Sequence, residues 1–123
     1  MRLASLWVPV VLYMAAIFYI QSLSSPPSPP GVNDKVEHLV GYGLLGLLAA
    51  RATAGGLGRR VSLGAALLAV ALTSGYGITD EFHQGFVPER TRDVLDWYAD
   101  TVGGLLGASS VTAWGILVTS RIR

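Results

Sequence analysis

The chain has 123 residues, of which 51% are hydrophobic and 14% are charged, and its formal net charge is +1. Soluble domains carry about 25% charged residues, and a domain this short buries too little of its surface to hide so much apolar area. The composition therefore predicts a membrane protein with a single domain over residues 1–123. The near-neutral charge gives no basis for nucleic-acid binding. The absence of cysteine excludes disulfides, thiolate catalysis and iron–sulfur clusters.

Four apolar segments are long enough for membrane helices, which need about 20 residues to cross the hydrocarbon core. They cover approximately residues 3–23, 34–54, 61–82 and 93–118, and glycine- or proline-rich segments separate the first three. Asn33 or Asp34 is a suitable N-cap for the second helix. We therefore expect an all-α fold, a four-helix transmembrane bundle. A cleaved signal peptide is the alternative for the first segment, but its apolar stretch exceeds the usual 7–15 or so residues.

The basic residues predict the orientation of this bundle. If the chain crosses the membrane four times, one side of the membrane contains Arg2, Arg51, Arg59, Arg60, Arg121 and Arg123. The positive-inside rule makes that side cytoplasmic, so both termini are expected in the cytoplasm. All eight acidic residues fall on the other side or in the outer ends of the spans.

Three of the predicted helices carry polar side chains at this outer end. Helical spacing places the members of each group on or near one face, and the groups are Asp34, His38 and Tyr42; Asp80, Glu81 and Gln84; Asp93, Asp96 and Asp100. Carboxylates at membrane depth are costly unless they face protein, water or a cation. We therefore expect them to converge on an outward-facing polar pocket, with Lys35, His38, His83, Arg90 and Arg92 as candidate partners. The alternative is structural, with Asp34 and Asp93 as N-caps or first-turn residues favoured by the helix dipole and His38 and Tyr42 hydrogen-bonded inside the bundle.

Glycines in three spans predict close helix packing, because a missing side chain lets two backbones approach. They are Gly41, Gly43 and Gly46 in the second span, Gly75 and Gly77 in the third, and Gly103, Gly104 and Gly107 in the fourth.

These residues resemble the pattern of the VanZ-like membrane proteins. The D-K-x-x-H-x-x-x-Y motif of that family is similar to Asp34 through Tyr42, and its D-E-x-x-Q…F-x-P-x-R segment resembles Asp80 through Arg90. Asp93 and Asp96 with the following glycines resemble its last helix. Two positions depart from it: Asp100 stands where we expect asparagine, and Glu89 where we expect glycine.

The resemblance implies an integral protein of the bacterial cell (inner) membrane, and the family's eponymous member is associated with low-level resistance to teicoplanin. It implies no established reaction. The site residues that it carries over are Asp34, Lys35, His38, Tyr42, Asp80, Glu81, Gln84, Arg90 and Asp96, to which the spacing argument adds Asp93 and Asp100.

Two classes of function stay open at this stage. The first is a non-catalytic protein whose pocket binds a lipid, a cell-wall precursor or a lipophilic glycopeptide, with Arg90 and Arg92 available for a phosphate or carboxylate. The second is an intramembrane enzyme with Glu81, His38 or Asp80 in acid–base roles.

Metal binding and transport are weaker alternatives. The metal-ligand candidates are Asp34, His38, Asp80, Glu81 and His83, without a recognisable spacing. A transporter would require oligomers, and the oligomeric state does not follow from the sequence. No organic cofactor is expected, since no cofactor-binding motif is present.

Overall fold

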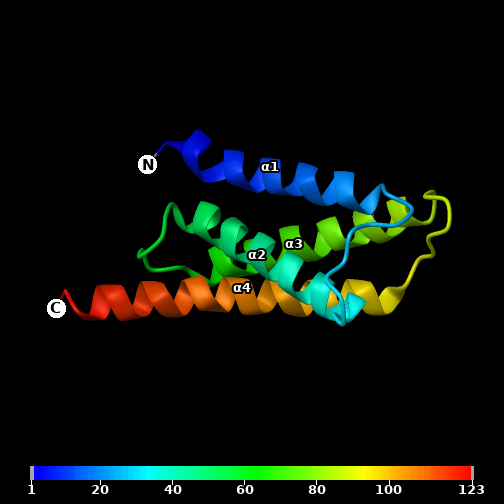
Figure 1. Cartoon of the computed structure of the whole chain (residues 1–123). Coiled ribbons are helices and arrows are strands. Elements are labelled where there is room, and N and C mark those ends of the chain that lie inside the picture. The colour runs from blue at the N-terminus through cyan, green and yellow to red at the C-terminus, as the bar shows by residue number, and fades with distance from the viewer. Residues whose placement is uncertain (1, 123) are drawn as a thin grey trace.

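The computed structural model describes residues 2–122 and consists of four helices in an antiparallel, up-and-down arrangement (Figure 1). They are α1 (Leu3–Gln21), α2 (Asp34–Ala54), α3 (Leu63–Gln84) and α4 (Val94–Ser120). The start of α1 and the end of α4 lie at one end of the bundle beside the α2–α3 loop, whereas the α1–α2 and α3–α4 loops lie at the other end. This confirms the all-α four-helix fold. Arg123, assigned above to the basic end, lies outside the described residues.

The helix boundaries follow from local capping. The Asn33 side chain accepts a hydrogen bond from the Lys35 backbone N–H at 2.7 Å, and Asp93 accepts one from Leu95 at 2.9 Å. Gly55 ends α2 in a left-handed conformation with φ of 81°, where glycine carries no steric penalty. Asp93 is therefore the N-cap of α4, and Asp34 is the first residue of α2 with Asn33 as its cap, both as the structural alternative proposed.

Three of the described helices are long and apolar enough to span a membrane: α1, α3 and α4. The expectation of four apolar spans therefore holds for three helices on length and composition. The exception, α2, packs against all three of the others. Because much of its surface faces protein, α2 can carry polar residues such as Asp34 and His38 that a lipid-facing helix could not.

Glycines bring α2 and α4 into backbone contact, as the glycine pattern predicted. A Cβ on Gly46 would lie 2.5 Å from the Gly104 carbonyl oxygen, and Cβ atoms on Gly103 and Gly107 would collide with the α2 backbone near Gly43. In the third span, a Cβ on Gly77 would lie 3.0 Å from Asp100 Oδ2, whereas a Cβ on Gly75 would meet nothing within 4 Å. The α2–α4 contact therefore depends on missing side chains, and it fixes which faces of the two helices meet.

Candidate functional site

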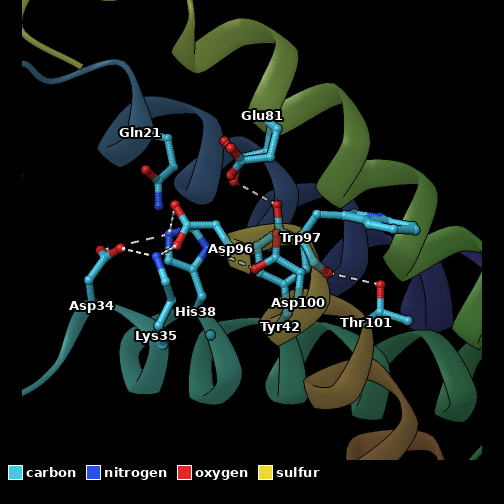
Figure 2. Close-up of polar contacts among 12 residues, drawn as sticks. Gln21, Asp34, Lys35, His38, Tyr42, Glu81, Asp96, Trp97, Asp100 and Thr101 are labelled. Atoms are coloured by element: carbon cyan, nitrogen blue, oxygen red, sulfur yellow. Dashed lines mark hydrogen bonds and ion pairs between the residues drawn. The ribbon is translucent and has the colours of Figure 1, made fainter. Parts of the chain in front are cut away.

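The predicted polar residues converge at the end of the bundle that holds the α1–α2 and α3–α4 loops (Figures 1 and 2). The set of buried polar side chains there comprises His38, Tyr42, Asp80, Glu81, Gln84, Asp96 and Asp100. They come from α2, α3 and α4. The helical faces that the spacing predicted are therefore turned toward one another.

Lys35 neutralises the outer part of this cluster. Its ammonium lies 2.7 Å from Asp93 Oδ2 and 3.5 Å from Asp34 Oδ2, and it also donates to Asp96 Oδ1. The N-termini of α2 and α4 are thus joined by one cation between carboxylates. The hydrogen bond from Lys35, with a second one from the Leu95 backbone, holds the pKa of Asp93 below its ordinary value.

His38 lies deeper and touches carboxylates on both sides of its ring (Figure 2). Nδ1 lies 2.7 Å from Asp100 Oδ1, while Nε2 lies 3.6 Å from Asp96 Oδ2 and 3.9 Å from Asp34 Oδ1. The Asp100 contact orients the imidazole and leaves Nε2 facing both Asp96 and Asp34.

The innermost part of the cluster is formed by Tyr42, Asp80 and Asp100. The Tyr42 hydroxyl donates to Asp80 Oδ2 at 2.8 Å. Asp100 is fully buried, and its Oδ2 has no hydrogen-bond partner among the described residues. One ligand atom from each of His38, Asp80 and Asp100 lies within 4.8 Å of the other two. Asp100, which departs from the expected family pattern, is therefore central to the cluster.

A hydrogen-bond network through Glu81, Gln84 and Arg90 connects the α3–α4 loop with the end of α1. Glu81 accepts a hydrogen bond from the Asp93 backbone N–H at 2.9 Å. With the amide nitrogen of Gln84 facing Glu81 and its oxygen facing Arg90, Gln84 donates to Glu81 Oε1 and accepts from Arg90 Nε, both at 3.1 Å. Arg90 also donates to the Leu23 carbonyl at 3.1 Å and to Gln21 Oε1 at 2.8 Å.

The other two candidate partners of the carboxylates lie elsewhere. His83 stacks on Phe18 with ring centroids 4.4 Å apart, and Arg92 lies over the Phe82 ring and donates to the Phe82 carbonyl at 3.2 Å. Among the described residues, neither forms an ion pair with a carboxylate. The residue that the sequence analysis missed is Gln21, whose signal is its amide near the end of an otherwise apolar first span.

A cavity of about 420 Å³ adjoins the cluster between α1, α2 and the proline-rich loop. Its apolar lining includes Ile17, Ile20 and Val40, and its polar lining includes Asp34, His38 and Arg90. Val40 and Ile20 remain 66% and 41% exposed, so the cavity is open to its surroundings. Both an apolar chain and a polar head could therefore contact this one site.

The structure has four helices, three of which are apolar spans, and it gathers carboxylates, a histidine and a tyrosine at one end of the bundle. These features define a small multi-pass membrane protein with a polar interior site. The VanZ/LLP1 family model matches residues 28–117, which is most of the chain and includes every buried polar side chain of the cluster. The chain belongs to the VanZ/LLP1 family. Searches of curated proteins and of solved structures found no match.

Proposed function

We propose that this chain is a multi-pass protein of the bacterial cell membrane that binds an amphiphile in the cavity beside its carboxylate cluster. Both termini would be cytoplasmic, because the positively charged end of the bundle favours the inner side. The cavity and the carboxylate cluster would then open toward the outer face. Family membership supports the bacterial membrane assignment, since the family's eponymous member is a bacterial resistance protein.

The observation that carries the proposal is the mixed lining of the cavity. Ile17, Ile20 and Val40 offer an apolar wall of the kind that accommodates an acyl chain, while Asp34 and His38 line the same space. Ligand sites commonly combine an apolar wall with a few polar groups that fix orientation. A lipid, a lipid-linked cell-wall precursor or a lipophilic glycopeptide has this combination of properties.

The charges favour an amine in the polar head of the ligand. Asp34 and Glu37 both line the cavity, and the Asp34 side chain is 58% exposed. Arg90 also lines the cavity, but its guanidinium already donates hydrogen bonds to the Leu23 carbonyl and to the side-chain oxygens of Gln21 and Gln84. We therefore assign ligand contact first to the carboxylates, and to Arg90 the role of holding the cavity wall. The same binding would lower glycopeptide access if the bound amphiphile were teicoplanin or its target.

The direct test is native mass spectrometry of the purified protein with phosphatidylethanolamine, an amine-bearing lipid, against phosphatidylglycerol. Val36→Trp should reduce lipid binding, because Val36 lines the cavity and tryptophan would fill it. Val102→Trp is the matched control, since both valines are 47% exposed and Val102 does not line the cavity. Equal lipid binding by both variants would contradict the proposal.

A second test concerns the head group. Asp34→Asn should remove the preference for the amine-bearing lipid, whereas Glu89→Gln, a loop carboxylate outside the cavity lining, should keep it. Teicoplanin susceptibility of a sensitive bacterium expressing the same variants, at matched membrane abundance, then tests the link to resistance. Protection by the wild type that Asp34→Asn lacks would connect the cavity to the drug.

One observation favours an enzyme as the second candidate. The contact between His38 Nδ1 and Asp100 leaves Nε2 facing Asp96 and Asp34, and His38 lines the cavity. An imidazole oriented by a carboxylate in this way is the arrangement of a general base. Purified protein incubated with membrane lipids would then change the lipid profile, and His38→Gln would abolish the change. An unchanged lipid profile with folded wild-type protein would exclude this candidate.

A further inference from the structure

The inner part of the carboxylate cluster has no counterpart of Lys35; among the described residues its basic group is the His38 imidazole, which lies 2.7 Å from Asp100 Oδ1. Lys35 forms ion pairs with Asp34, Asp93 and Asp96. In contrast, no lysine or arginine among the described residues forms an ion pair with Asp80 or Asp100. Asp80 is 5% exposed and Asp100 is 0% exposed. Two buried carboxylates facing one another are costly unless a cation or a shared proton compensates them.

The available donor atoms lie close together. His38, Asp80 and Asp100 each supply one nitrogen or oxygen, and these atoms all lie within 4.8 Å of one another. Metal–nitrogen and metal–oxygen bonds of about 2.0–2.2 Å place ligand atoms roughly 3.3 Å apart in a tetrahedral site. Closing the group around an ion therefore requires side-chain adjustments on the order of 1 Å, without any displacement of a helix.

An unsatisfied atom provides independent support for a ligand here. Asp100 Oδ2 is buried without a hydrogen-bond partner among the described residues, and such atoms in a native structure call for an explanation such as an ion. It is directed toward α3, where a Cβ on Gly77 would lie only 3.0 Å away. Asp80 follows Gly77 by three residues on that helix, so the free oxygen of Asp100 lies on the side from which Asp80 approaches.

The surroundings also supply a supporting hydrogen bond. The Tyr42 hydroxyl donates to Asp80 Oδ2 at 2.8 Å, and ligating carboxylates in metal sites are typically held by such outer partners. The proton at the contact between His38 Nδ1 and Asp100 Oδ1 would leave when the ion binds, because metal ligands must be deprotonated.

We propose that His38, Asp80 and Asp100 bind one divalent transition-metal ion, with Tyr42 orienting Asp80. One nitrogen and two carboxylate oxygens suit Zn²⁺ or Mn²⁺, and the usual affinity order favours zinc. Three protein ligands leave an open position, as in catalytic zinc sites. Calcium is disfavoured because it takes six to eight oxygen ligands. This inference does not depend on amphiphile binding, and either proposal can fail without the other.

The test is Zn²⁺ binding by the purified full-length protein in mild detergent, measured by competition with a fluorescent chelator and by metal analysis after desalting. The wild type should retain one zinc per chain. Asp80→Asn and Asp100→Asn, which preserve size, should each lose it, and Glu89→Gln should retain it. Tyr42→Phe should weaken zinc affinity about 10–100-fold, as expected for an outer partner of a ligand.

Several results would overturn the assignment. Folded wild-type protein with substoichiometric zinc would do so, as would Ca²⁺ displacing zinc at equal concentration, which would indicate simple charge screening. Loss of zinc in Asp34→Asn but not in Asp80→Asn would move the ion to the other close group, Asp34, His38 and Asp96. Because the zinc content and calcium competition need only wild-type protein, the proposal stays testable even if a variant does not fold.

Discussion

His38 and Asp100 are 62 residues apart, yet His38 Nδ1 lies 2.7 Å from Asp100 Oδ1 across the interface of α2 and α4. Both side chains are buried. This contact joins the two helices whose glycines already bring their backbones together. It places the residue that departs from the expected family pattern, Asp100, at the centre of the site.

Substitutions at Asp100 should distinguish the contribution of its hydrogen bond with His38 to stability from the contribution of its charge. In protein freed of metal with a chelator, Asp100→Asn retains a group that can pair with His38 Nδ1 in either tautomer and removes a buried charge, so the free energy of unfolding should change by less than about 1 kcal/mol. Asp100→Ala leaves the buried ring nitrogen unpaired and should cost about 1–3 kcal/mol. Reversible unfolding in mixed micelles measures both. Equal losses in the two variants would show that an amide does not replace the carboxylate, which would assign the stabilisation to the charge and not to the hydrogen bond.

The α2–α4 contact should be intolerant of a single methyl group. Gly46→Ala places a Cβ 2.5 Å from the Gly104 carbonyl oxygen, and such overpacking should lower the free energy of unfolding by about 1–3 kcal/mol. Gly75→Ala is the matched control in α3, where a Cβ meets nothing within 4 Å. It should be neutral or stabilising by about 0.5–1 kcal/mol, because alanine is the better helix former. The same unfolding assay applies, and a Gly46→Ala variant as stable as Gly75→Ala would contradict this packing.

The α3–α4 loop should contain removable strain at Glu89. This residue has a φ of 66°, in the left-handed region, which costs non-glycine residues about 1–2 kcal/mol. Glu89→Gly should therefore stabilise the protein by up to about 1 kcal/mol, after the larger entropy loss of glycine on folding. Glu89→Ala keeps a Cβ and should give no such gain. Stabilisation by alanine equal to that by glycine would assign the effect to the lost charge.

Asp93 should make stability depend on acidic pH. Its pKa is lowered, chiefly by the hydrogen bond from Lys35, from the ordinary value of 3.8. A lowered folded-state pKa stabilises the protein above the ordinary value, and this contribution is lost as the pH falls below 3.8 through the folded pKa. The neighbouring charged groups are Lys35 and, through the Asp93 backbone, Glu81.

The measurement is unfolding of wild type and Asp93→Asn between about pH 3 and pH 6, around the ordinary aspartate pKa. The stability difference between them should be constant at the upper end and shrink at the lower end. Glu89→Gln is the control carboxylate. A difference that grows as the pH falls would contradict the direction of the Asp93 shift.

The helices could be predicted from the sequence because their signals are local. Uncharged apolar runs, the cap at Asn33 and the glycine at 55 gave ends within about two residues of those observed. The grouping of Asp34, His38 and Tyr42 on one face could also be predicted from the sequence, since helical spacing determines it. The central position of α2 could not be predicted in this way, because it depends on how the four helices pack.

The particular pairs in the site were beyond sequence reasoning. Which carboxylates His38 meets, and with which ring nitrogen, depends on the rotation and relative depth of α2 and α4, which the glycine contacts set. Arg90 was expected to be available to a ligand, yet it donates to Gln21 Oε1 and the Leu23 carbonyl, and the Gln21 contact spans 69 residues. No local pattern marks a partner that distant.

The measurement that tests the central claim most directly is photo-crosslinking of the protein in bilayers with an amine-headed phospholipid that carries a photoreactive group in its acyl chain. Peptide mapping should locate the crosslinks mainly at Ile17, Ile20, Val36 and Val40, which line the cavity. Val36→Trp should reduce them, and Val102→Trp should not. Crosslinks distributed evenly over the exposed apolar faces of α3 and α4, and unchanged in Val36→Trp, would contradict an amphiphile site beside the carboxylate cluster.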